Sequence, residues 1–146
     1  MNAGVKEEEI SNNLLAINGK DKNNFDFSYR NSSINEPVFV ALFEIKRNYD
    51  KKLDEYLKNL RKNQPKEPSL GSVFKNPKGD FAGRLIEKVG MKGKVKGGIK
   101  ISEIHANFFI NIGGGTFEDM MFLINEVKKR VFEEEGIKLE LEIKIV

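Results

Sequence analysis

The chain has 146 residues and contains no cysteine, no tryptophan and a single histidine. The absence of cysteine excludes disulfide frameworks, cysteine nucleophiles and zinc sites with thiolate ligands. No hydrophobic run approaches the roughly 20 residues needed to cross a bilayer. The N-terminus also lacks the basic-then-apolar pattern of a secretion signal. We therefore expect a cytoplasmic protein without a membrane partner.

Charge of either sign is nearly balanced, with 25 Lys and Arg against 22 Asp and Glu, for a net charge of +3. That excess is too small to indicate a nucleic-acid partner, and the aromatic pair at Phe108 and Phe109 lacks an RNA-binding sequence motif around it. Lys92, Lys94 and Lys96 form a basic stretch among glycines. The stretch is either a solvated loop or a site for an anion such as a diphosphate.

The first half of the chain mixes loops with short apolar segments. We expect a short strand at 14–17 within an otherwise irregular N-terminal region, and a strand buried on most of both faces at the apolar run 38–45. Apolar residues at helical spacing predict a helix over 49–61. Two prolines within 64–68 end that helix and indicate a linker.

Elements alternate in the second half. The pattern predicts an extended segment at 69–75, a helix at 81–89, strands at 99–102 and 107–112, and a half-buried strand at 139–145. Thr116 and Asp119 indicate a capping box for a last helix that ends at Gly136. The predicted core face of that helix consists of Phe117, Met120, Met121, Ile124, Val127 and Val131. The fold class is α+β.

Two isolated features could carry chemistry. The glycines at 113–115 precede a helix and could cradle a phosphate, but they lack the lysine and hydroxyl residue of a P-loop and suit a turn equally well. His105 is either a hydrogen-bonded structural residue or a general base or metal ligand. No ligand constellation accompanies it in the sequence, so we predict no metal site.

The segment 71–77 (GSVFKNP) combines a hydroxyl, an amide and a cation between glycine and proline. Together with the preceding PSL it resembles the signature loop of UDP-N-acetylenolpyruvoylglucosamine reductases, flavoenzymes of peptidoglycan synthesis. The similarity continues in order through 81–87, 90–93, 97–103 and 105–108, and ends at 136–143. Upstream, residues 28–32 (SYRNS) resemble the tyrosine-arginine motif of the same family. The motifs are collinear and cover essentially the whole chain.

This resemblance implies a reaction and a set of site residues. Reduced FAD, recharged by NADPH, would deliver a hydride to C3 of the enolpyruvyl ether of UDP-N-acetylglucosamine enolpyruvate, and a proton would be added at C2. By the resemblance, Ser72 is the proton donor, Arg30 stabilises negative charge on the substrate, and Glu142 is the catalytic carboxylate. The resemblance further implies substrate binding by Asn76, Tyr29 and Lys75, and cofactor binding by Asn2, Ala3 and Gly4.

The sequence pattern alone leaves these roles open. Glu142 also suits a solvent-facing strand position, Arg30 a surface ion pair, and the polar residues of 71–77 an ordinary turn.

The family pattern also divides the chain. Residues 1–67 would be the remainder of an FAD-binding region and residues 68–146 the C-terminal substrate-binding domain. In the family an N-terminal FAD-binding lobe precedes the residues that match Met1, and we expect that lobe to be a partner. Glu7 and Glu8 stand where the family usually has glycines beside the flavin. The alternative is a non-catalytic, truncated relative that binds UDP-sugars without reducing them.

Overall fold

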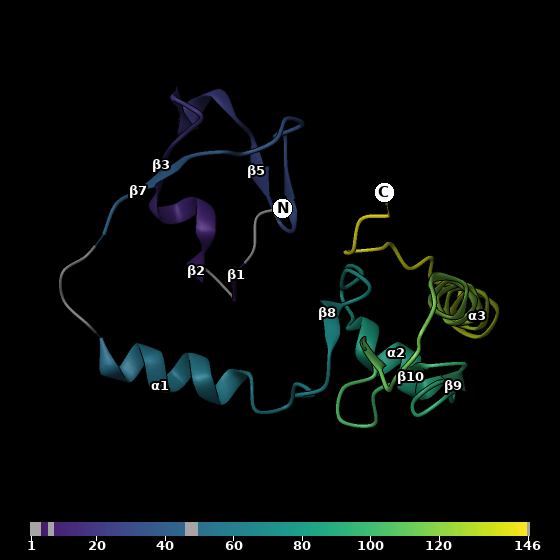
Figure 1. Ribbon diagram of the computed structural model, residues 1–146. Coiled ribbons are helices and arrows are strands. Elements are labelled where there is room, and N and C mark those ends of the chain that lie inside the picture. The colour runs from purple at the N-terminus through teal and green to yellow at the C-terminus, as the bar shows by residue number, and fades with distance from the viewer. Residues whose placement is uncertain (1–3, 6–7, 46–49, 146) are drawn as a thin grey trace. The chain divides into compact units, whose positions relative to one another are not determined.

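The computed structural model describes residues 4–5, 8–45 and 50–145. The chain divides into two compact units, Met1–Leu60 and Arg61–Val146, which we call the first and second unit. The labels of Figure 1 are used for their elements. The predicted α+β class is confirmed, because both helices and antiparallel sheets are present.

The first unit is built from short antiparallel ladders. β1 (Gly4–Val5) pairs with β2 (Glu8–Glu9), and β5 (Phe27–Ser28) pairs with β6 (Asn31–Ser32). The predicted strand at 14–17 is β3 (Leu14–Ile17), which lies between β4 (Lys20–Asp21) and β7 (Ala41–Phe43). Short 3₁₀ turns, η1 (Ile10–Asn13) and η2 (Lys22–Asn24), connect these strands. The predicted helix is α1 (Lys51–Leu60); its expected start at residue 49 lies outside the described residues.

The prediction of a strand at 38–45 that is buried on most of both faces is wrong. Only Ala41–Phe43 forms a strand, and every residue from 38 to 45 is exposed, with Phe39 at 85%. β7 pairs with β3 on one edge, and Asn18 holds the chain beside it by accepting the N–H of Phe39 at 2.9 Å. An apolar run shows that a strand can be buried, but only a second layer of structure buries it.

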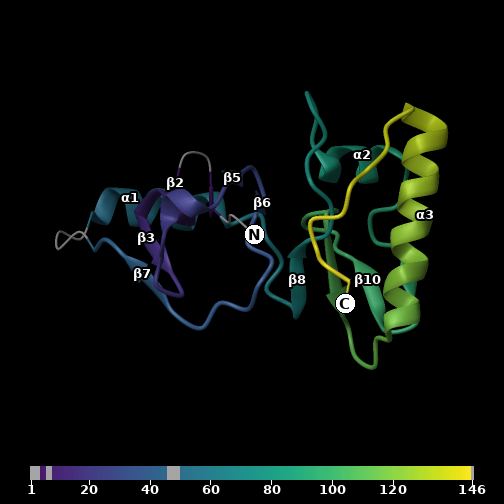
Figure 2. The ribbon, with the colours of Figure 1, turned by 90° about the horizontal axis from the view of Figure 1, so that it is seen from above.

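The second unit contains a four-stranded antiparallel sheet in the order β8-β11-β10-β9. The strands are β8 (Ser69–Ser72), β9 (Val95–Lys96), β10 (Ile99–Ile101) and β11 (Phe108–Asn111). Two helices, α2 (Ala82–Lys88) and α3 (Phe117–Glu135), accompany the sheet, and Figure 2 shows α3 running alongside β10. Among the helices that the structure describes, none is long and apolar enough to cross a membrane.

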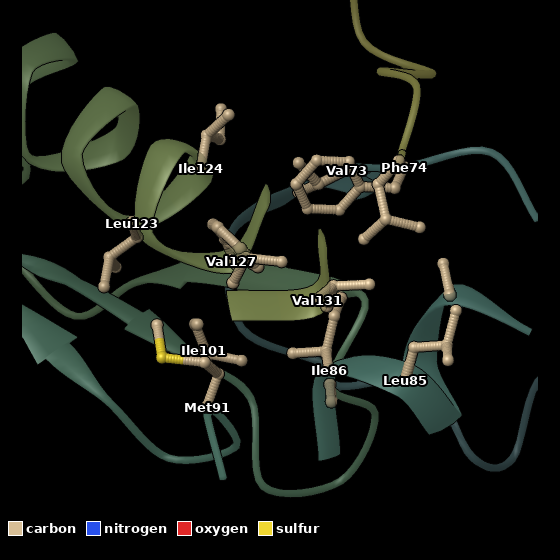
Figure 3. Packing of buried hydrophobic residues seen from close by; sticks show 14 of the residues in the cluster. Val73, Phe74, Leu85, Ile86, Met91, Ile101, Leu123, Ile124, Val127 and Val131 are labelled. Atoms are coloured by element: carbon tan, nitrogen blue, oxygen red, sulfur yellow. The ribbon is translucent and has the colours of Figure 1, made fainter. Parts of the chain in front are cut away.

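One hydrophobic core joins the sheet to both helices. Leu85 and Ile86 of α2 and Val127 and Val131 of α3 are completely or almost completely buried in the same cluster as Ile101 of β10. Figure 3 shows these side chains turned toward one another. Val73 and Phe74, which follow β8, are fully buried in this cluster too. The core therefore reaches the segment that the sequence singled out for chemistry.

Helix α3 begins and ends as predicted. The Thr116 hydroxyl accepts the N–H of Asp119 at 3.1 Å, and the Asp119 carboxylate accepts the N–H of Thr116 at 3.2 Å. This hydrogen bond from Thr116 is the main cause that lowers the pKa of Asp119. Gly136 ends the helix with a φ of 69°. The predicted core face is wrong at Phe117, which is 60% exposed, and it omitted Leu123, which is buried.

The prediction of a regular C-terminal strand at 139–145 is also wrong. The segment makes one isolated antiparallel bridge, between Leu141 and Phe74. The expected alternation of buried and exposed side chains is present in part, because Leu139 is buried and Glu140 is exposed. The partner available for pairing is only the short segment 73–75, so a longer ladder does not form.

We expect Gly98→Ala to destabilise the second unit by about 1–3 kcal/mol, because an added Cβ would overlap backbone atoms of Gly113 and Gly115. Thermal or urea unfolding followed by circular dichroism measures the change. Gly90→Ala is the matched control: its Cβ would meet open space, and its positive φ of 67° alone would cost about 1 kcal/mol. Equal losses in the two variants would contradict a steric role for Gly98.

Candidate functional site

Ser72 is the last residue of β8 and pairs with Phe108 of β11. It is half-buried, whereas Val73 and Phe74 after it are fully buried. β8 is an edge strand, and the register between β8 and β11 shifts between Phe108 and Ile110. Such irregularities re-aim side chains at the end of a ladder. The structure therefore places Ser72 at the boundary between the core and the solvent.

The C-terminal segment brings Glu142 beside the residue that follows Ser72. The N–H of Glu142 donates to the carbonyl of Val73 at 2.9 Å, and the N–H of Lys75 donates to the carbonyl of Glu140 at 2.9 Å. Glu142 is half-buried rather than fully exposed. Ser72 and Glu142, about 70 positions apart in the sequence, thus belong to neighbouring antiparallel segments.

Lys75 belongs to the same pair of antiparallel segments. Its ammonium group is 3.7 Å from the exposed carboxylate of Glu140. An ion pair of this length with one exposed partner contributes little to stability.

A cavity of about 530 Å³ opens next to Ser72, inside the second unit. Ser72 and Asn76 both line it, so the structure brings together two of the predicted site residues. Arg84 of α2 and His105, from the loop before β11, line it as well. The volume falls within the usual range for a small-molecule pocket, and its lining offers hydroxyl, amide, guanidinium and imidazole groups.

Asn76 is fixed at the entry to α2. Its side-chain oxygen accepts the N–H of Ala82 at 3.0 Å and so satisfies one of the free donors at the start of the helix. In the first turn, the guanidinium of Arg84 donates to the carboxylate of Asp80, with 2.7 Å between Arg84 Nε and Asp80 Oδ1. This hydrogen bond from Arg84 is the main cause that lowers the pKa of Asp80 to about 2.

His105 is held as a neutral ring. Its Nδ1 atom accepts the N–H of Asn107 at 3.2 Å, and the ring meets Phe108 edge-on with centroids 5.0 Å apart. A Cβ added at Gly83 would lie 3.0 Å from His105 Cε1, so the absence of a side chain on α2 makes room for the ring. Within residues 4–5, 8–45 and 50–145, no group of three potential ligands gathers for a metal ion. These contacts support the structural interpretation of His105.

Asn107 is a site residue that sequence reasoning passed over. It is only 3% exposed, and its side-chain amide bonds both backbone groups of Phe74. The signal was present in the sequence, because an amide within an apolar strand pattern must find partners when it is buried.

Tyr29 and Arg30 lie in the first unit, in the turn between β5 and β6. The Arg30 guanidinium lies 5.2 Å from the centre of the Tyr29 ring. Arg30 has a φ of 54°, a left-handed conformation that few non-glycine residues adopt. Non-glycine residues held in this conformation are frequent at functional sites. Of the predicted cofactor-binding residues, Gly4 lies in β1, whereas Asn2 and Ala3 lie outside the described residues.

The glycines at 113–115 and the basic stretch at 92–96, which could each have indicated a phosphate site, have structural explanations. The Asn111 side chain accepts the N–H groups of Gly113 and Gly115 at 2.9 and 3.3 Å, so the glycine segment is a turn with donors already engaged. Lys92 pairs with Glu87 at 2.8 Å, and Lys96 lies over the ring of Phe122. These lysines thus have different partners, which favours the solvated-loop interpretation.

We expect the pKa of His105 to lie below its ordinary value of 6.5, chiefly because burial disfavours the charged ring. The unfolded chain would bind the proton more readily, so the stabilisation from the neutral ring is complete above pH 6.5 and is lost as the pH falls through the folded-state pKa. Because the chain has one histidine, its ring protons can be followed by NMR without ambiguity. A pKa at or above 6.5 would contradict this expectation.

Comparisons with known proteins point to one family. A sequence profile described as "UDP-N-acetylenolpyruvoylglucosamine reductase, C-terminal domain" matches residues 64–146. Over its whole length the chain is 51% identical to the reductase of that name from Campylobacter jejuni (strain RM1221), and it covers 58% of that protein. It is 52% identical to the reductase from Helicobacter hepaticus and covers 57% of it.

A crystal structure of the reductase from Thermus caldophilus resembles the structure of this chain with a TM-score of 0.82 and 33% identity, over 99% of this chain and 57% of that one. The chain therefore spans somewhat more than half the length of these relatives. The matched range contains Ser72, Asn76 and Glu142. The chain belongs to the UDP-N-acetylenolpyruvoylglucosamine reductase family, and residues 64–146 correspond to the C-terminal domain of that family.

Proposed function

We propose that this chain serves in peptidoglycan synthesis, in the cytoplasm, in the reduction of UDP-N-acetylglucosamine enolpyruvate to UDP-N-acetylmuramate with FAD and NADPH. The observation that carries the proposal is the arrangement around Ser72. Ser72 and Asn76 line one cavity, and the backbone of Glu142 pairs with the residue that follows Ser72.

The residues of this chain supply proton transfer and charge stabilisation. When bound, FAD supplies to C3 of the enolpyruvyl group a hydride that comes from NADPH. Ser72 donates the proton that C2 needs, so that the double bond gains one hydride and one proton. Glu142 would act as the catalytic carboxylate beside the proton donor, and Arg30 would stabilise the negative charge that the hydride leaves on the substrate.

The remaining predicted residues would bind the substrate. Asn76 offers amide donors to the cavity, since its oxygen is engaged at the start of α2. Lys75 and Tyr29 would contact the anionic and ring portions of the nucleotide sugar. Residues 68–146 would act as the substrate-binding domain and residues 1–67 as part of the FAD-binding region.

The described part of the first unit fits FAD at one point. Asn2, Ala3 and Gly4 would hold the cofactor, and Gly4 offers a backbone that a flavin can approach closely. Gly4 pairs with Glu9 across the β1-β2 ladder, which fixes the backbone at this position.

We expect Ser72→Ala to lower reduction of UDP-N-acetylglucosamine enolpyruvate by a factor of about 10²–10⁴, the usual contribution of a proton donor. Affinity for the substrate, measured by calorimetry, should stay within about twofold, since a hydroxyl that acts in the transition state adds little to ground-state binding. Turnover is followed as substrate-dependent oxidation of NADPH in the presence of FAD.

Ser69→Ala is the matched control, because Ser69 lies on the same strand and outside the cavity next to Ser72. Full turnover by the Ser72 variant would contradict its role as proton donor. Substrate binding by the unchanged chain without any turnover would instead favour the non-catalytic UDP-sugar-binding alternative.

We expect flavin absorption bands to accompany the chain through gel filtration after incubation with FAD, and NADPH to bleach them. The absorption spectrum of the protein fraction before and after NADPH is the measurement. Flavin found only in the small-molecule fraction would contradict the assignment of cofactor binding to residues 1–67, and would leave the cavity of the second unit as the functional part.

A further inference from the structure

The residues 73–75 lie between two segments that come from distant parts of the sequence. On one side, the N–H of Val73 donates to the carbonyl of Asn107 at 2.8 Å. On the other side, Val73 and Lys75 exchange hydrogen bonds with Glu142 and Glu140. All of these bonds are between backbone groups, so they fix position along the chain as well as distance.

The Asn107 side chain completes this arrangement where β11 no longer provides a partner. Its Oδ1 atom accepts the N–H of Phe74 at 3.0 Å, and its Nδ2 atom donates to the carbonyl of Phe74 at 2.8 Å. The side-chain amide thus pairs with Phe74 as a neighbouring peptide group would. Both residues are buried, so neither Phe74 group has water as a substitute.

Asn107 is itself held in place. Its N–H donates to Nδ1 of His105 at 3.2 Å, and it precedes Phe108, the residue paired with Ser72. A series of contacts therefore leads from His105 through Asn107 to Phe74. Phe74 lies two residues after Ser72, in the segment whose other neighbour contains Glu142.

We propose that Asn107 is a positioning residue that sets the register between Ser72 and Glu142 for proton transfer to the substrate. This inference rests on the proposed function. Asn107 acts through the backbone of residues 73–75, and its two bonds to Phe74 keep that segment paired with residues 140–142.

The test uses two variants of the full chain. Asn107→Asp keeps the shape and the acceptor but replaces the donor with an oxygen, so an ionised carboxylate repels the carbonyl of Phe74. A protonated carboxyl restores the donor. Asn107→Ser is too short to make both bonds at any pH and serves if the first variant folds poorly. Asn111→Asp is the matched control, since Asn111 uses only its acceptor oxygen, toward Gly113 and Gly115.

The measurement is amide hydrogen exchange by NMR at Lys75 and Glu142, whose bonds do not involve the Asn107 side chain, relative to Val127 and Val131 in α3. We expect exchange at Lys75 and Glu142 to accelerate at least about tenfold relative to α3 in Asn107→Ser, and in Asn107→Asp at high pH. Protection should return in Asn107→Asp as the pH falls, but not in Asn107→Ser. His105, Glu140 and Glu142 also face this segment, so the unchanged chain and the Asn111 variant are measured over the same pH series.

Equal acceleration of all amides would show that Asn107 supports only the stability of the whole unit, and would overturn the proposal. Unchanged exchange, or no return of protection at low pH, would overturn it as well.

A second arm separates the proposal from the proposed function. On addition of UDP-N-acetylglucosamine enolpyruvate, the amides of Ser72 and Glu142 should shift with one shared dissociation constant in the unchanged chain. In Asn107→Ser the Glu142 shift should be lost while the Ser72 shift persists. If no amide shifts in the unchanged chain, the proposed function is contradicted, and with it the catalytic purpose of the register. Whether Asn107 sets the register is decided separately, by the exchange ratios.

Discussion

The pairing of residues 73–75 is the interaction on which the site of the second unit depends. Val73 and Phe74 carry fully buried side chains, so the backbone between them must find its hydrogen-bond partners within the protein. It finds them in Asn107 and in the C-terminal segment. The same bonds that satisfy buried polar groups also place the backbone of Glu142 beside Val73, the residue that follows Ser72.

The two helices have different tasks around this pairing. Helix α3 is long, carries a capping box at its start and buries Val127 and Val131 against the sheet. Helix α2 is short. Asn76 accepts a hydrogen bond at the start of this helix, and Arg84 of the helix lines the cavity. The long helix thus stabilises the core, while the short one shapes the wall of the pocket. The glycine at position 83 lets His105 approach that wall.

The first unit contributes residues of another kind. Tyr29 and Arg30 occupy a tight turn with one left-handed residue, and their side chains contact each other. In the second unit the predicted site residues are held by a buried core, whereas here a two-residue turn holds them. For both sets we propose a common purpose, the reduction of an enolpyruvyl nucleotide sugar.

The sequence by itself determined the α+β class, the helices 82–88 and 117–135, the capping box and the family, because these depend on neighbouring residues or on ordered motifs. Through the family resemblance it also singled out Ser72, Asn76 and Glu142, whose roles stay predictions. It failed at residues 38–45 and at Phe117, since an apolar residue is buried only if another element covers it. It could not reveal that Asn107 bonds Phe74 or that Glu142 bonds Val73. Those contacts join residues 33 and about 70 positions apart, and only the tertiary structure decides which distant backbone groups meet when water is excluded.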